Sequence, residues 1–285
     1  MQKSYIIKSA LTGLFILAAS ACANMSTNVI SADPSQETAL ETPFETGANS
    51  LFAGHSFFIP VASSFNKIGR QMGFEDHRVQ VVFAGGRKGT PGSLWSSKSK
   101  RQQIETALQT GKIDLFGLVA GGGGGSDTED FAKWVGLALQ YNPDTEFLIA
   151  RSWITGGPRT KTSMFDQEIA VKSSELYTVV TSLRSQFPGV QFHFINYGEA
   201  APVMKREFEA ERLDDIQEMS GKNNAALFRD RRQGHGGQMM LDVSALYWVH
   251  RLYGVELADL PSLGYAEEDV SGILIEVENV NPRFD

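Results

Sequence analysis

Ser56 follows a short apolar segment that ends in glycine, within the tetrapeptide Gly54-His55-Ser56-Phe57. A helical pattern begins directly after it, so the serine lies where a strand gives way to the first turn of a helix. The unpaired N–H groups and positive dipole end of such a turn stabilise an oxyanion, which suits Ser56 to nucleophilic catalysis. The alternative is that Ser56 caps the helix, since serine is a preferred N-cap residue. The segment is not a G-x-S-x-G nucleophile motif, because Phe58 stands at its last position.

A histidine late in the chain, His235, stands between Gly234 and Gly236. Flanking glycines let the backbone bend and leave the imidazole exposed, and a serine hydroxyl needs such a base because it barely ionises near neutral pH. Asp230 is close enough in sequence to orient the ring. The alternatives are that Asp230 pairs with a neighbouring arginine and that His235 is a surface histidine.

A glycine-rich turn at residues 85–92 follows the second predicted strand, and its backbone N–H groups can face an anion. Its spacing is not that of a phosphate loop. The sequence contains neither an H-E-x-x-H motif nor a cysteine pair, so we predict no metal and no cofactor. His55 adjoins Ser56 but is expected to point to the other face of its strand.

Short apolar segments alternate with amphipathic ones along the chain after residue 50. The apolar segments predict strands at residues 51–54, 79–84, 113–120, 146–150 and 190–196. Helical spacing predicts helices at residues 57–72, 101–110, 128–141, 173–187, 199–213 and 237–253. Residues 273–277 are interpreted as an added edge strand.

This alternation implies crossover connections between parallel strands, and near-continuous apolar strands fit a sheet that is covered on both faces. We therefore expect an α/β fold, a three-layer α/β/α sandwich with a mostly parallel five-stranded sheet. Binding sites in such sheets form at the carboxyl ends of the strands, where Ser56 and the glycine-rich turn are predicted to lie.

The order of these features resembles the SGNH (GDSL-like) hydrolase superfamily between about residues 51 and 254. Three family blocks have counterparts here: the Gly-Asp-Ser-Leu-like block in Gly54-His55-Ser56-Phe57, the oxyanion glycine in Gly89 or else Gly86, and the late D-x-x-H block in Asp230 and His235. The resemblance implies a flavodoxin-like fold and acyl transfer from an ester to water. Ser56 is then the nucleophile and His235 its base, with the N–H groups of Ser56 and of Gly89 or Gly86 holding the oxyanion.

Two departures from the family pattern concern the oxyanion and the acid. The family's G-x-N-D block, which donates an asparagine N–H, is replaced by residues 117–120 and five glycines. The N–H groups of residues 121–123 or Ser126 would have to substitute, because losing one oxyanion donor costs roughly 10²–10³ in turnover. Asp230 lies five residues before His235 where the family has three, and the three-residue position holds Arg232. Either Asp230 orients His235, or a backbone carbonyl does so, as in family members with a Ser-His pair.

The leading expectation is a serine ester hydrolase, of esterase or carbohydrate acyl-esterase type, whose partner is a small-molecule or carbohydrate ester. The alternative is a non-catalytic, ligand-binding envelope lipoprotein that keeps a degenerate form of the fold. A nucleotide-binding protein built on the glycine run is disfavoured, because the run lacks the lysine and hydroxyl that such sites use. Trp95 and Trp153 follow strand-end loops and are expected to line a substrate cleft.

The N-terminus resembles an export signal. Lys3 and Lys8 precede an apolar stretch at residues 10–21, which is short for a membrane span, and Cys22 follows as the only cysteine. Either a signal peptidase releases a free protein, or Cys22 is lipidated and membrane contact is through that anchor. We divide the chain into a signal peptide at 1–21, a flexible tether at 22–49 and the hydrolase-like domain at 50–285, and expect a periplasmic or cell-envelope location.

Charge and composition limit the classes of partner that this protein is expected to bind. The net charge of −7 and the pI of about 5.3 disfavour nucleic acid, because phosphate binding needs a basic face. Hydrophobic residues make up 42% of the chain, which is enough to form a large core, and with one cysteine no internal disulfide is expected.

Overall fold

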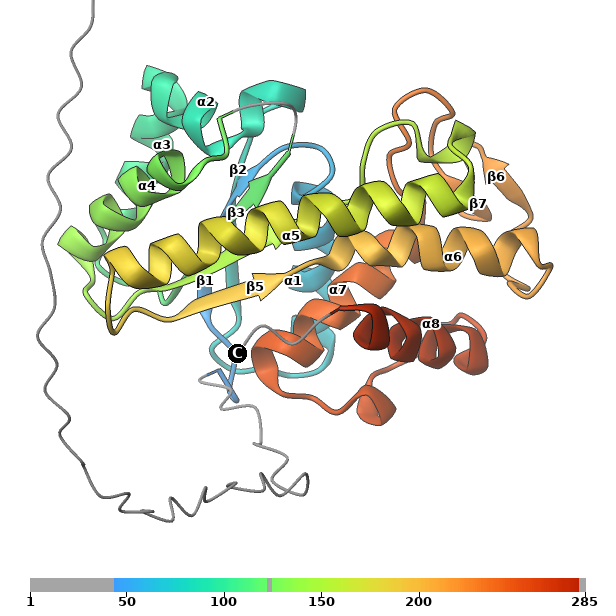
Figure 1. The fold of residues 1–285 in the computed structure, drawn as a ribbon. Helices are drawn as coiled ribbons and strands as arrows, with labels where there is room; N and C mark the ends of the chain where they lie inside the picture. Colours follow the sequence, from blue (N-terminus) through green and yellow to red (C-terminus); the bar gives the residue numbers. More distant parts are fainter. Residues whose placement is uncertain (1–43, 122–124, 282–285) are drawn as a thin grey trace, which may run out of the picture. The chain divides into compact units, whose positions relative to one another are not determined.

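The computed structural model describes residues 44–121 and 125–281, and its centre is a five-stranded sheet in the order β2-β1-β3-β4-β5 (Figure 1). Every neighbouring pair is parallel. The strands are β1 (Asn49–Gly54), β2 (Arg78–Phe83), β3 (Leu115–Ala120), β4 (Glu146–Arg151) and β5 (Phe192–Ile195). The predicted α/β fold is confirmed, and the strand order is that of flavodoxin-like sheets.

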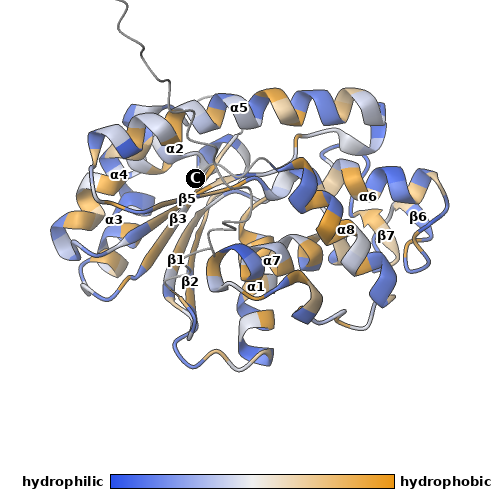
Figure 2. Cartoon of the chain, turned by 60° about the horizontal axis from the view of Figure 1, so that its bottom comes forward, coloured by the Kyte–Doolittle hydropathy of each residue, from blue (hydrophilic) through white to orange (hydrophobic). Residues whose placement is uncertain are grey.

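Helices cover both faces of this sheet, as the continuous apolar strands predicted. The main helices are α1 (Ile59–Gln71), α2 (Pro91–Ser96), α3 (Lys98–Leu108), α4 (Thr128–Tyr141), α5 (Thr162–Gln186), α6 (Ala200–Glu209), α7 (Gln238–Tyr253) and α8 (Glu267–Val280). Figure 2 shows α5 with α2, α3 and α4 on one side of the strands, and α1 with α7 on the other.

Alternate residues of each strand feed two hydrophobic clusters, one on each face of the sheet. Phe52 and Leu148 pack with α1 and α7, whereas Leu51 and Ile149 pack with α3, α4 and the second half of α5. The strands β1, β3 and β4 are buried almost throughout, while the edge strand β2 leaves Val81 and Phe83 exposed.

The interpretation of residues 273–277 as an edge strand is wrong, because they lie inside α8. Val270, Ile273, Leu274 and Val277 are buried at helical spacing against the cluster that contains α7. Helix α5 begins at Thr162, eleven residues before the predicted helix start at residue 173. A short parallel pair, β6 (Glu218–Ser220) and β7 (Ala226–Phe228), was not predicted.

The domain reaches further toward the N-terminus than the predicted boundary at residue 50. Phe44 and Ala48 are buried, and Asn49 is the first residue of β1, so the end of the predicted tether packs against the domain. The predicted signal peptide, Cys22 and the rest of the tether lie outside the described residues. Within the described part of the chain, none of the helices has the length and apolar character needed to cross a membrane.

Candidate active site

Ser56 lies in the turn between β1 and α1, at the carboxyl end of a central strand. Helix α1 begins three residues later, with Phe58 at its N-cap position and no side chain capping it. The carbonyl of His55 accepts the N–H groups of Phe58 and Ile59, which shapes the turn. Ser56 is therefore not the cap of this helix, and its hydroxyl is directed elsewhere.

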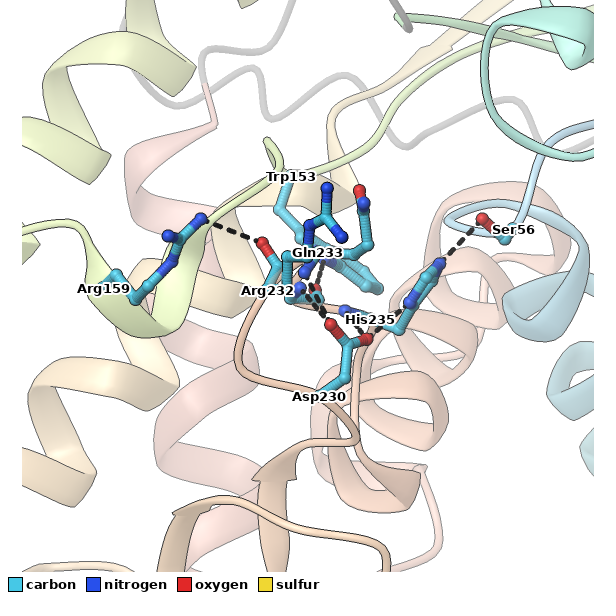
Figure 3. Close-up of polar contacts among 8 residues, drawn as sticks. Ser56, Trp153, Arg159, Asp230, Arg232, Gln233 and His235 are labelled. Atoms are coloured by element: carbon cyan, nitrogen blue, oxygen red, sulfur yellow. Dashed lines mark hydrogen bonds and ion pairs between the residues drawn. The ribbon is translucent and has the colours of Figure 1, made fainter.

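The hydroxyl of Ser56 lies 2.9 Å from Nε2 of His235, although 179 positions separate the two residues (Figure 3). On the other side of the ring, Nδ1 of His235 lies 2.6 Å from Oδ2 of Asp230. An ionised carboxylate can only accept, so Nδ1 carries the proton and Nε2 is left as the acceptor that faces the serine. The fold thus brings the three predicted catalytic residues into one hydrogen-bonded row.

The loop between β7 and α7 holds Asp230 and His235 in this arrangement. Asp230 accepts the backbone N–H groups of Gln233 and Gly234 through Oδ1 and that of His235 through Oδ2. Gly234 has a φ of +78°, a left-handed conformation that favours glycine and lets the chain turn back. Because this turn brings the Asp230 carboxylate next to the His235 ring, the two side chains are in direct contact although five positions separate them in sequence.

The family position three residues before the histidine holds Arg232, which has a different contact. Its carbonyl accepts a hydrogen bond from the guanidinium of Arg159 at 3.1 Å. Two groups were considered as the hydrogen-bond partner of Nδ1 of His235. In the structure this partner is the carboxylate of Asp230 and not a backbone carbonyl.

Hydrogen bonds to Asp230 control its ionisation. Burial raises the pKa of this carboxyl, but the N–H of Gln233, the His235 ring and the N–H groups of His235 and Gly234 outweigh it and lower the pKa to about 2. Asp230 is therefore negatively charged at neutral pH and can stabilise a positive charge on His235.

Three aromatic residues fix the two loops that carry Ser56 and His235. Phe57 stacks on the His235 ring, with centroids 4.9 Å apart and planes at 30°. The indole N–H of Trp153 donates to the carbonyl of Gly234 at 2.8 Å, and the hydroxyl of Tyr197 donates to the carbonyl of Phe57 at 2.7 Å. Held by these contacts, the imidazole has little freedom to turn away from the serine.

A pocket of about 700 Å³ opens beside Ser56 and His235. Its walls are the turn after β2, the segment after β4 and the part of α5 between residues 168 and 179. Trp153 lines it as predicted, but Trp95 does not, because its ring lies against Trp134 with centroids 4.9 Å apart. The volume lies in the range of small-molecule sites.

The two candidate oxyanion glycines differ in position. Gly86 lines the pocket, whereas Gly89 is buried and is not part of the lining. A side chain at Gly89 would collide with the carbonyl of Ala84 and the backbone of His55, at 2.5 and 2.7 Å, so close packing requires glycine there. Of the substitutes for the asparagine, Gly121 and Ser126 line the pocket, and residues 122 and 123 lie outside the described residues.

His55 and Arg151 line the same pocket, and the sequence interpretation did not include either in the site. Burial lowers the pKa of His55 to about 4, although a hydrogen bond to the backbone of Ala120 acts in the opposite direction. The ring is therefore neutral at pH 7. An arginine at the end of an otherwise apolar strand was the signal that would have identified Arg151. Across residues 44–121 and 125–281, no three His, Cys, Asp or Glu side chains gather closely enough to hold a metal ion.

No protein-family model matches the chain, and no curated protein matches it in sequence. A DUF4886 family protein from Bacteroides uniformis is similar in structure, with a TM-score of 0.53 and 13% identity over 82% of this chain and 94% of that one. A second structure, the periplasmic domain of a lipopolysaccharide acetyltransferase from Salmonella serovar Paratyphi A, has a TM-score of 0.42 and 9% identity, covering 72% and 84% of the two chains. At such identities, the first of these similarities establishes a shared fold.

Proposed function

We propose that this protein is a serine ester hydrolase, with Ser56 as nucleophile, His235 as general base and Asp230 as the orienting carboxylate. The observation that supports this proposal is the continuous row of short contacts, 2.9 Å from Ser56 to His235 and 2.6 Å from His235 to Asp230, beside an open pocket. A serine, an imidazole and a carboxylate in this order define a nucleophile activated by a base.

The reaction follows from the protons that these groups hold. Nε2 of His235 takes the proton of Ser56 as the oxygen attacks the ester carbonyl, and the backbone N–H groups of Ser56 and Gly86, which line the pocket, hold the resulting oxyanion. His235 then gives the proton to the leaving alcohol, which leaves an acyl group on Ser56. A water that passes its proton to His235 attacks this acyl-enzyme. His235 then returns that proton to the Ser56 oxygen as the acid leaves, which restores the free serine and the neutral base.

The class of substrate follows from the size and lining of the pocket. A volume of about 700 Å³ accommodates a small ester or an acylated sugar, and the ring of Trp153 is an apolar surface within it. The order of the serine, glycine-turn and histidine blocks, which resembles that of SGNH hydrolases, gives further support to an esterase or carbohydrate acyl-esterase.

Covalent labelling tests the nucleophile. A fluorophosphonate probe should label the wild-type domain once, because an activated serine attacks phosphorus, and the Ser56→Ala variant should not be labelled. Ser152→Ala is a matched control from the same pocket and should keep the label. If the folded wild type is not labelled, the alternative of a ligand-binding protein without turnover replaces the hydrolase.

We further propose that the chain is exported and that Cys22 carries a lipid, which would place the domain at the cell envelope. The support is the basic and apolar leader ahead of the only cysteine. The processed chain should begin at Cys22 and be heavier than its residues by the attached acyl groups in an intact-mass measurement. A mature chain of unmodified mass would instead indicate release by a signal peptidase.

A further inference from the structure

Arg151 carries a positive charge in a buried position. It is the last residue of β4, is 6% exposed, and its Nε is buried without a hydrogen bond. Within residues 44–121 and 125–281, its guanidinium forms no hydrogen bond or ion pair, although it lines the pocket that contains Ser56 and His235. A buried charge is normally paired, because removal from water is strongly unfavourable.

The side chain of Arg151 lies on the α5 side of the sheet. Phe147 and Ile149 of the same strand pack into the cluster on that face, and alternation places Arg151 with them. One terminal nitrogen of Arg151 and the Nε2 of His55 both lie close to Gly121, at 3.7 and 3.4 Å from where its side chain would begin. The guanidinium therefore lies near His55 in the wall of the pocket that also contains Ser56 and His235.

The charges around Arg151 do not neutralise it. Burial lowers its pKa, and Tyr197, Glu175 and Glu168 act in the opposite direction, but an arginine stays protonated in proteins. Both glutamates are exposed residues of α5 that form no ion pair with Arg151, and Glu175 lies 3.6 Å from Lys172. A planar guanidinium with free N–H groups matches a carboxylate in shape and charge, and the two can form paired hydrogen bonds.

We propose that Arg151 binds a carboxylate of the substrate, which makes this protein an esterase selective for esters that carry a negative charge. This proposal rests on the proposed function, because it assigns the substrate of the same pocket. The reaction stays as written above, and the carboxylate takes no part in bond making.

Matched esters test the assignment. On the alcohol side, 4-acetoxybenzoate is compared with 4-acetoxybenzamide, and on the acyl side the 4-nitrophenyl monoester of adipate is compared with 4-nitrophenyl pentanoate. We expect the wild type to favour the carboxylate of at least one pair by about 10-fold or more in kcat/KM, as charge-assisted hydrogen bonds allow. In Arg151→Met this ratio should fall to near one, while the neutral ester stays within about threefold of wild type.

Control variants separate binding from a general effect of charge or folding. Lys67→Met removes an exposed positive charge from α1, on the other face of the sheet, and should keep the wild-type ratio. Arg151→Lys should keep part of the preference for the charged ester, because the lysine ammonium keeps the positive charge but cannot form the paired hydrogen bonds of a guanidinium. The melting temperature of Arg151→Met should equal or exceed that of wild type, because an unpaired buried charge is removed. Should that variant not fold, Arg151→Gln takes its place in the comparison.

Binding without turnover distinguishes the two proposals. In a Ser56→Ala background, calorimetry should detect 4-acetoxybenzoate or adipate, and Arg151→Met should abolish that binding. Binding of 4-acetoxyphenyl phosphate alone would overturn the carboxylate in favour of a phosphate. Turnover of neutral and charged esters at equal rates, or an equal loss of both in Arg151→Met, would overturn the role of Arg151 while leaving the hydrolase intact. Arginine-dependent binding in a protein that hydrolyses nothing would overturn only the hydrolase.

Discussion

Ser56→Ala should lower kcat/KM for an activated ester by about 10⁴-fold or more, to the level that oxyanion contacts and binding alone supply. The reason is geometric: the hydroxyl of Ser56 is the group that Nε2 of His235 faces, at 2.9 Å. Release of nitrophenolate, followed in the steady state and in a pre-steady-state burst, measures the effect. The burst that reports the acyl-enzyme should disappear with the nucleophile.

A double variant makes this prediction stricter. If Ser56 and His235 act as one unit, Ser56→Ala combined with His235→Ala should be no slower than Ser56→Ala alone. Ser152→Ala, a neighbouring serine in the pocket, serves as the control and should stay within a few-fold of wild type. Losses that multiply in the double variant would show that the two side chains work independently, which is incompatible with the proposed mechanism.

Asp230→Asn should lower kcat by about 10²–10⁴-fold, because it favours the wrong tautomer of His235. The amide oxygen is held by the backbone N–H groups of Gln233 and Gly234, which Oδ1 accepts in the wild type. The amide nitrogen then faces Nδ1 of His235 and donates to it. The remaining ring proton moves to Nε2, which can no longer accept from Ser56.

Acid titration provides a second measurement of the same contact. The pKa of Asp230 is lowered to about 2 in the folded protein, from its ordinary value of 3.8. A lowered carboxyl pKa adds stability that is complete above the unfolded value and is lost as the pH falls through the folded one. The stability gap between wild type and Asp230→Asn in urea should therefore be constant above about pH 5 and shrink between about pH 4 and 2. A gap that stays constant down to pH 2 would mean that His235 and the loop do not depend on this charge.

The sheet was predictable from the sequence because its signal is local. Each of the five strands was identified from a continuous apolar run, and parallel order follows from the helices between them. The error at residues 273–277 has the same origin, since a short apolar run does not distinguish a strand from the buried side of a helix. The positions of Val270, Ile273, Leu274 and Val277 fit a helical face, which the shorter window did not include.

The candidate site was less predictable, because its contacts depend on tertiary structure. Ser56 and His235 were chosen by type and flanking glycines, and the structure places them in contact, while their catalytic roles remain predictions. The bond from Asp230 to His235 depends on a turn that the spacing alone did not reveal. Arg151 was missed because the pairing of a charge depends on tertiary structure: only the folded chain shows that its buried Nε has no hydrogen-bond partner among the residues that the structure describes.

Helix α5 supplies one wall of the pocket through Glu168, Lys172 and Glu175, yet it contributes nothing to the row formed by Ser56, His235 and Asp230. Substitutions on the exposed side of a helix usually change stability by less than about 0.5 kcal/mol. Mutation can therefore alter this wall in successive generations without disturbing the hydrolytic step. Among descendants of this chain, we expect substrate preference to diverge along α5 while the reaction itself is inherited unchanged.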